Sequence, residues 1–436
     1  MAEQRPLRVG IIGAGVSGIV TAAHLIEVGV DVTVLERLSK PGGRRPIGPE
    51  FPSILASKGE VYPKNSQPDL EQSPPGPCYL GLTNNVSTRL LQTEVSAWPS
   101  GTPDFVHHPV IEDYIQNMSR TTGVDAITLY GARVTDRAEF DGVVASGHHH
   151  APRVPDLLGL KDWRAAWPTR IWHSRSYRKP DEFRGKNILL IGAGTSSTDI
   201  ERELGPVAGI IYQSSRGGGF DLSAKLLPEN GIRVGVIASF DGDVCQHQAT
   251  HLLDDDPLPG TITLESGQQL CNIHFVVVCT GYHITLPFLS SFHEDNTPVE
   301  EASDTILVTD GWRVHNLHKH VFYIPDPTLV FIGLPYHVST FNLYDFQAVA
   351  VAAVFSGRVA LPSEEMREEY RNYLQVRGSD KDFHSLGGDE EGYVQPLLDW
   401  INKDATAKGF LSIGGHTEGW HVAKAEHIKR ITPFFV

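Results

Sequence analysis

Two glycine-rich segments constrain the fold of this chain more than any other feature of its 436 residues. The first, RVGIIGAGVSG, places Gly13, Gly15 and Gly18 between an apolar run and a stretch with helical spacing. Because glycines lack side chains, such a turn lets a pyrophosphate approach the backbone N–H groups at a helix N-terminus. The strand-like run Asp31–Glu36 follows, and Glu36 stands where an acid binds a ribose hydroxyl. The segment is therefore predicted to be a βαβ unit that binds a dinucleotide.

The second segment, NILLIGAGTSS, repeats this plan with Gly192 and Gly194, and Ser197 takes the place of the third glycine. Its second strand ends in SSR, residues 214–216, and carries no acid at that point. Hydroxyl and guanidinium groups bind a 2′-phosphate, which an acid would repel. The alternative is that Arg216 is an ordinary solvated surface charge. The pattern favours NADPH over NADH.

Two such units in one chain predict an α/β fold with two Rossmann-like, dinucleotide-binding domains. We expect the first domain to be discontinuous, with residues 1–170 and 284–436 flanking an inserted domain of residues 171–283. Prolines interrupt any periodicity between Pro41 and Pro77, so this stretch is predicted to be a loop. A helical tail is expected after Pro362.

Composition excludes several classes of function. The formal net charge of −15 disfavours nucleic-acid binding, which depends on clustered lysine and arginine. The four cysteines form no C-x-x-C pair, and the triplet His148–His150 lacks regular metal-ligand spacing, so neither a redox dithiol nor a metal site is expected. No apolar run approaches the ~20 residues that span a bilayer, and a cytoplasmic protein without an integral membrane segment is expected.

The segment just before the second glycine turn identifies a family. It reads WPTRIWHSRSY, in which His173 and Tyr177 have the spacing of the fingerprint FxGxxxHxxx(F/Y) of the flavin-containing monooxygenases. Trp167 and Thr169 stand where the fingerprint has Phe and Gly. Three further landmarks stand in family order between and beyond the two glycine turns: LTN at residues 82–84, VVVCTGY at 276–282 and YIPDPTLVFIGLP at 323–335. The chain therefore resembles this family of class B flavoprotein monooxygenases, in particular its short, soluble yeast and fungal type.

The resemblance implies FAD in the first domain and NADPH in the second. It also implies a C4a-hydroperoxyflavin that transfers one oxygen atom from O2 to a nucleophilic nitrogen or sulfur of a small molecule, as in N,N-dialkylaniline-type oxygenases. Asn84 matches the family's active-site asparagine, although TNN also suits a residue that completes a turn. His173 is expected to tie down the linker between the domains rather than to transfer a proton directly, and Tyr177 completes the linker fingerprint. Arg45 replaces the tryptophan that is usual in the family.

Residues predicted to bind the cofactors lie at the two glycine turns, at the strand ends beside them and at the crossover between the domains. They are Gly13, Gly15, Val16, Ser17, Gly18, Glu36, Arg37, Gly43, Arg44, Asn84, Gly192, Gly194, Thr195, Ser196, Ser197, Ser214, Ser215, Arg216, Thr280, Gly281 and Tyr282.

Three other functions share these features. The same intermediate can attack a ketone, which gives carbon oxygenation of the Baeyer–Villiger type. A pyridine nucleotide–disulfide reductase also has two dinucleotide folds, but it needs a reactive dithiol that this sequence lacks. A non-catalytic flavin-binding redox or scaffold protein is the remaining alternative, since a fold does not guarantee turnover. A homodimer is compatible with all of these functions.

Overall fold

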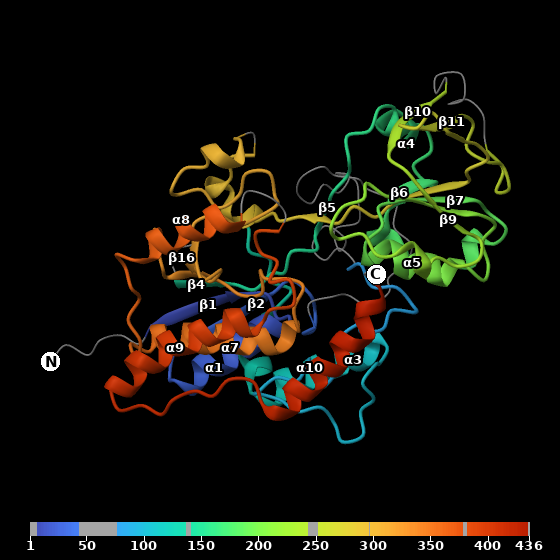
Figure 1. The fold of residues 1–436 in the computed structure, drawn as a ribbon. Coiled ribbons are helices and arrows are strands. Elements are labelled where there is room, and N and C mark those ends of the chain that lie inside the picture. Colours follow the sequence, from blue (N-terminus) through green and yellow to red (C-terminus); the bar gives the residue numbers. More distant parts are fainter. Residues whose placement is uncertain are drawn as a thin grey trace.

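The computed structural model describes residues 7–42, 76–136, 141–242, 252–295, 297–377 and 382–434. The chain forms two lobes, each built around a parallel sheet, with a narrow connection between them (Figure 1). The sheet of the first lobe is assembled from both ends of the chain, whereas the second lobe comes from the middle. This arrangement confirms the predicted α/β fold with one dinucleotide-type domain inserted into another.

The first sheet has the strand order β15-β16-β17-β4-β1-β2-β3. Its parallel strands are β1 (Arg8–Ile12), β2 (Asp31–Glu36), β3 (Thr128–Tyr130), β4 (Asp141–Val144) and β17 (Leu329–Phe331). Two short antiparallel strands, β16 (Phe322–Tyr323) and β15 (Leu317–His318), extend one edge. The pairing of β17 with β4 brings residues from far apart in the sequence into one sheet.

Helices cover this sheet. Helix α1 (Val16–Glu27) packs against α7 (Thr340–Phe355), and α7 packs in turn against α9 (Glu391–Ala407). Because α7 lies between two helices, it is apolar on nearly all sides rather than on one stripe. His24 of α1 donates from Nε2 to Oδ1 of the buried Asp345 of α7 at 3.0 Å.

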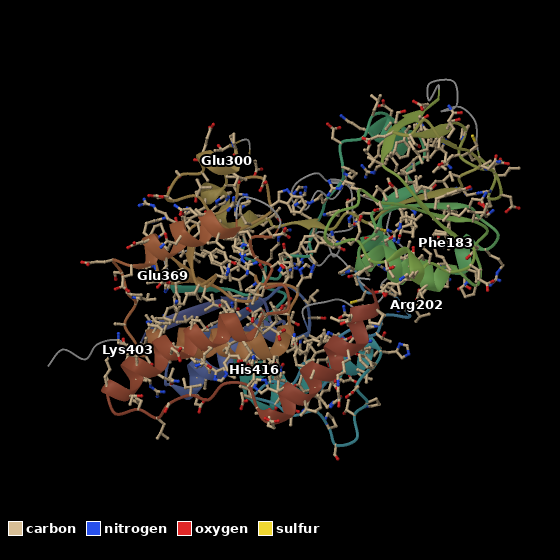
Figure 2. All side chains as sticks on the ribbon, in the orientation of Figure 1. Phe183, Arg202, Glu300, Glu369, Lys403 and His416 are labelled. Atoms are coloured by element: carbon tan, nitrogen blue, oxygen red, sulfur yellow. The ribbon has the colours of Figure 1, made fainter. Side chains whose placement is uncertain are left out.

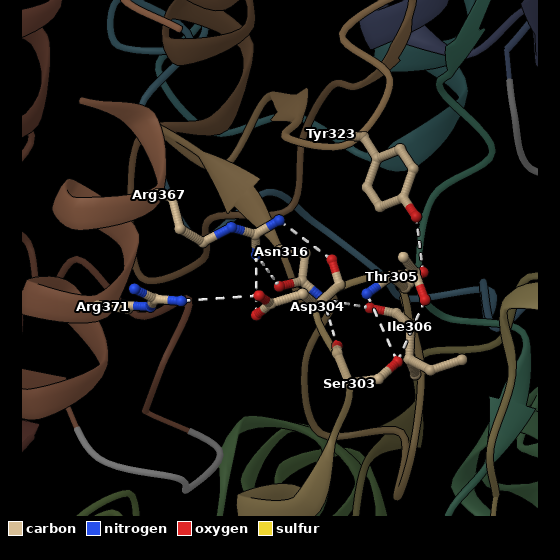
Figure 3. Close-up of polar contacts among 8 residues, drawn as sticks. All are labelled: Ser303, Asp304, Thr305, Ile306, Asn316, Tyr323, Arg367 and Arg371. Carbon is tan, nitrogen blue, oxygen red and sulfur yellow. Dashed lines mark hydrogen bonds and ion pairs between the residues drawn. The ribbon is translucent and has the colours of Figure 1, made fainter. Parts of the chain in front are cut away.

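Three further helices complete the first lobe: α3 (His108–Thr121), α8 (Met366–Arg377) and α10 (Glu418–Ile431). Helix α8 is tied to two loops by the contacts in Figure 3, in which Arg367 donates to Oδ1 of Asn316 at 2.5 Å and Arg371 pairs with Asp304 at 3.6 Å. Asn316 adopts a left-handed φ of 59° and donates to the carbonyls of Ser303 and Ile306.

The second lobe has a five-stranded parallel sheet with the order β6-β13-β7-β8-β9 and one face covered by α5 (Thr195–Leu204). Its strands are β6 (Ile171–His173), β7 (Ile188–Ile191), β8 (Ile211–Ser214), β9 (Gly231–Val234) and β13 (Phe275–Val278). An antiparallel sheet of β10 (Ile237–Asp241), β11 (Thr261–Leu264) and β12 (Gln269–Leu270) lies beside α4 (Leu160–Ala166). Every residue of β7 and β13 is buried, as expected for strands covered on both faces.

Two short antiparallel strands connect the lobes, β5 (Ala151–Pro152) and β14 (Tyr282–His283) (Figure 1). Trp163 and Trp167, which precede β6, pack in the core of the second lobe. We therefore propose that the inserted domain begins just after β5 rather than at residue 171.

Short 3-10 helices cover Val124–Ile127, Ser174–Ser176, Asp181–Phe183, Ala224–Leu226, Pro287–Phe292, Val299–Glu301 and Thr432–Phe434. Side chains fill both lobes, and the charged residues Arg202, Glu300, Glu369 and Lys403 lie exposed at the surface (Figure 2). Within the described ranges, no helix is both long enough and apolar enough to cross a bilayer.

Candidate cofactor sites at the two glycine turns

Two glycines of the first turn, Gly13 and Gly18, leave no room for a side chain. Gly13 has a φ of +108°, and a Cβ built on it would lie 2.7 Å from the carbonyl oxygen of Ala145. A Cβ on Gly18 would overlap the carbonyl oxygen of Gly13. Gly15 caps α1 in an extended conformation without any side-chain cap, and Val16, Ser17 and Gly18 form the first helical turn. The N–H groups of this turn therefore face the glycine cradle, where an anion can accept from them.

Glu36 supports this turn from the end of β2. The residue is buried, and its carboxylate accepts from Ala14 N at 2.7 Å and from Leu38 N at 2.8 Å. Each carboxylate oxygen keeps a second lone-pair position, which suits the ribose hydroxyls of a dinucleotide. Glu36, Arg37 and Gly13 line a cavity of about 350 Å³.

The same cavity is lined by residues that the sequence analysis did not assign to it. These include Ala132–Thr135, His148–His150, Arg175, Thr285, Pro287 and Phe288. His150 contacts Ser146 O at 2.5 Å through Nε2 and lies 3.3 Å from Arg37 through Nδ1, while Arg175 donates to its backbone carbonyl at 2.6 Å. In the sequence, the position of this histidine triplet just after β4 was the signal that could have placed it at the cavity. No group of three metal-binding side chains occurs among the residues described.

The cavity and cradle fit FAD. Only glycine fits at positions 13 and 18, an acid is positioned for a ribose, and arginine and histidine side chains provide donors for a pyrophosphate. Gly43, Arg44 and Arg45 lie outside the described residues.

The second glycine turn repeats the geometry of the first. Gly192 has a φ of +112°, and its Cβ would lie 2.7 Å from the carbonyl oxygen of Cys279. Gly194 caps α5 without a side-chain cap, and Thr195, Ser196 and Ser197 form the first turn. This equivalence supports a second dinucleotide site at the same edge of the second sheet.

Ser197 replaces the third glycine with a buried hydrogen bond. Its Oγ accepts from Nε2 of Gln213 on β8 at 2.8 Å, and Gln213 also donates to Glu201 at 2.6 Å. Burial raises the pKa of Glu201 to about 7. A hydrogen bond between α5 and β8 thus replaces the close packing that a glycine would allow.

The three residues predicted to bind a 2′-phosphate differ in their surroundings. Ser214 donates to Gly235 O at 2.9 Å, and Ser215 donates to Asp221 at 2.5 Å, so both hydroxyl hydrogens are used within the protein. The Arg216 side chain is exposed. Asp221, which the sequence analysis did not consider, places an acid in the same loop, where it also accepts from Gly218 N. Arg216 is therefore the main candidate of the three.

The linker residues are joined by hydrogen bonds. His173 donates from Nε2 to Gly281 O at 2.9 Å and accepts from Arg175 N through Nδ1 at 3.1 Å. Burial lowers the pKa of His173 to about 3, so the ring is neutral. Thr280 donates to Arg153 O at 2.6 Å. The ring of Tyr282 makes T-shaped contacts with the rings of His149 and His173.

Tyr177, the other fingerprint residue, lies deeper in the second lobe. It is fully buried and donates to Glu203 of α5 at 2.6 Å. His173 thus contacts the linker, whereas Tyr177 joins the second lobe's helix α5 to the segment after β6.

Asn84 has an amide that is already occupied. Its Nδ2 donates to Val86 O at 2.6 Å and to Asp104 O at 2.8 Å, and its Oδ1 accepts from Val106 N at 2.6 Å. Both amide hydrogens are therefore used by backbone carbonyls. These contacts favour the turn-completing role over donation to a flavin, and they make Asn84 a brace between residues 82–86 and 104–107.

Comparisons with known proteins agree with this geometry. The family described as flavin-binding monooxygenase-like matches residues 114–237, and an NAD(P)-binding Rossmann-like domain matches residues 11–46. The flavin-containing monooxygenase ustF2 of Aspergillus flavus is 44% identical, over 97% of each chain. The monooxygenase ustF1 of the same fungus is 37% identical, over 97% of this chain and 90% of its own.

Solved structures share the fold. An S-allyl-L-cysteine S-oxygenase from Allium sativum matches 98% of this chain and 93% of its own, with a TM-score of 0.70 and 23% identity. Tmm from a Pelagibacter species matches 98% of this chain and 90% of its own, with a TM-score of 0.68 and 18% identity. With two curated relatives above 30% identity along nearly its whole length, the chain belongs to the flavin-containing monooxygenase family.

Proposed function

We propose that this protein uses FAD in the first lobe and NADPH in the second to oxygenate a nucleophilic nitrogen or sulfur of a small molecule. The observation that carries the proposal is the repeated glycine turn, present on both sheets and joined by a two-stranded linker. The net reaction consumes NADPH, a proton, O2 and the substrate, and it yields NADP+, water and the oxygenated substrate. FAD, when bound, supplies the redox chemistry that couples NADPH oxidation to O2.

The protein's own residues bind the two cofactors and position them. The two glycine turns offer helix N-terminal N–H groups to two pyrophosphates, and Glu36 fixes the first turn through Ala14 N. His173 holds the linker through Gly281 O, so that the lobes keep a defined separation. The similarity in fold to an S-allyl-L-cysteine S-oxygenase supports sulfur as one acceptor atom.

Product analysis tests the function. Purified protein with FAD, NADPH and ¹⁸O2 is given a sulfide, a tertiary amine and a cyclic ketone in parallel. The expected result is one ¹⁸O atom in a sulfoxide or N-oxide. Cyclohexanone monooxygenase shares the fold at a TM-score of 0.58 and 12% identity, so the ketone is included to test for carbon oxygenation. Lactone formation without heteroatom oxidation would contradict the proposal.

Arg216→Ala is expected to raise the KM for NADPH about 10-fold or more and the KM for NADH little, because one phosphate contact is lost. Arg202→Ala is the matched control, since Arg202 is also exposed in the second lobe and pairs with Asp199 of α5. Equal changes in the KM values for NADPH and NADH would contradict the assignment of Arg216 to the 2′-phosphate.

Asn84→Ala is expected to leave FAD bound and to divert NADPH oxidation toward hydrogen peroxide. The loss of three hydrogen bonds loosens residues 82–86 and 104–107, at a cost of about 1–3 kcal/mol. The ratio of peroxide to oxygenated product and the melting temperature are measured together. Asn85→Ala, at the exposed neighbouring position, is the control. Unchanged coupling would show that this loop does not shape the reaction site.

A further inference from the structure

Arg153 is held at the junction of the two lobes. It directly follows β5, its backbone N–H donates to Gly281 O at 2.9 Å, and its carbonyl accepts from Thr280 at 2.6 Å. The side chain extends back toward the first lobe, where its guanidinium carbon lies 3.0 Å from the ring centroid of Trp312. A residue of the linker thus contacts both lobes.

The guanidinium of Arg153 has few polar partners. Nη2 donates to Tyr282 O at a long 3.4 Å, and Nε is buried without a hydrogen bond. Among the residues that the structure describes, no carboxylate forms an ion pair with Arg153. By contrast, Arg89 uses its guanidinium on both Asp104 and Glu426. A partly buried guanidinium without an anion is costly, since its charge has lost solvation without compensation.

Two charged side chains act on Arg153 in opposite directions. Its pKa is lowered to about 10, first by burial and also by the positive charge of Arg216, while Asp310 acts in the opposite direction. Asp310 accepts from Trp312 N at 2.9 Å and lies beyond ion-pair distance of Arg153. Two cationic side chains therefore approach each other at the junction.

The loop that carries Arg216 lies against both lobes. Leu222 N donates to Ala193 O in the second glycine turn at 2.8 Å. The Phe220 ring stacks on His337 of the first lobe, with 4.7 Å between centroids. Arg216 therefore belongs to a loop that contacts both the second glycine turn and the first lobe.

We propose that Arg153 binds an oxyanion of a ligand held between the lobes, either a substrate carboxylate or a phosphate of the nicotinamide nucleotide. Stacking on Trp312 fixes the plane of the guanidinium, and its terminal N–H groups can then donate to such a group. The carboxylate source rests on the proposed function, whereas the phosphate source rests only on nucleotide binding to the second lobe.

The test uses equilibrium binding to the FAD-loaded protein. Arg153→Gln and Arg153→Lys are titrated with NADP+, with 3-(methylthio)propionate and with its neutral amide, 3-(methylthio)propanamide. Arg358→Gln is the matched control, because Arg358 also stacks on an aromatic ring, Phe410, but lies beyond the end of α7. Flavin content and melting temperature establish that each variant is folded.

Arg153→Gln is expected to weaken binding of one anionic probe about 10- to 100-fold, and Arg153→Lys is expected to recover part of the loss. A loss of affinity for NADP+ alone would show that Arg153 binds a phosphate of the nucleotide. A loss of affinity for the propionate, with unchanged affinity for the amide, would show that Arg153 binds a substrate carboxylate. Unchanged affinity for both anions, or an equal loss for propionate and amide, overturns the proposal. Because binding is measured directly, absence of sulfoxide from the wild-type protein would count against the proposed function and not against Arg153.

Discussion

Gly13→Ala is expected to purify without flavin, whereas Gly192→Ala is expected to keep its flavin and lose reduction by NADPH. At each position the added Cβ would lie 2.7 Å from a carbonyl oxygen, that of Ala145 or of Cys279. Each φ, +108° or +112°, is also one that L-residues rarely adopt. The backbone must shift at the point where a pyrophosphate approaches it, and the two cofactors should respond separately because the turns lie in different lobes.

Two measurements check this pair: the ratio of flavin to protein absorbance, and the rate of flavin reduction by NADPH without oxygen. Gly29→Ala and Gly267→Ala are matched controls, because both glycines have a φ of +82° with nothing within 4 Å of the added Cβ. These controls are expected to lose only about 1–2 kcal/mol of stability. Normal flavin content in Gly13→Ala would refute the first site.

Acidification from pH 7.5 to 5.5 is expected to lower the free energy of unfolding by several kcal/mol. Burial lowers the pKa of His173, His315, His318 and His320 to about 3, and it lowers that of His384 further below its usual range. These rings stay neutral in the folded protein, but in the unfolded chain they bind protons near pH 6.5. Their stabilising effect is therefore complete above about pH 6.5 and declines as the pH falls toward 3, by roughly 1 kcal/mol each down to pH 5.5.

Hydrogen bonds in the first lobe agree with neutral rings. His384 accepts from Val314 N through Nε2 at 3.0 Å, so its Nδ1 carries the proton and donates to Nδ1 of His320 at 2.9 Å. The melting temperature of the FAD-loaded protein, measured across this pH range, checks the prediction. A flat profile between pH 7.5 and 5.5 would show that these histidines titrate normally in the folded state.

Much of the architecture follows from local sequence. The strand at Asp31–Glu36 and the helices that follow the two glycine turns, from Val16 and from Thr195, appear where they were predicted, because apolar periodicity and glycine turns are local signals. The strand Thr128–Tyr130 is only three residues long and follows a 3-10 turn, so its sequence carries little periodic signal. The two-residue strands β5 and β14 are too short to produce any periodic pattern.

The parts of the site that depend on tertiary contacts were not predictable in this way. Glu36 and the glycines could be placed from their spacing, but His148–His150 and Arg175 enter the first cavity only through the packing of the linker. Asn84 was assigned by family resemblance, and only the coordinates show that its amide is engaged by Val86, Asp104 and Val106. Sequence spacing likewise gave no signal that Arg153 would lie over Trp312.

The pairing of β17 with β4 has a consequence for biosynthesis. The first sheet needs Leu329–Phe331 beside Asp141–Val144, and the intervening residues include the whole second lobe. During translation the second lobe leaves the ribosome as a continuous unit and can fold first, since domains generally fold as units. The sheet that carries the first glycine turn becomes complete only after β17 emerges. Flavin capture is thus expected to be a late event, and nascent chains stalled before residue 329 should bind nicotinamide nucleotide but no flavin.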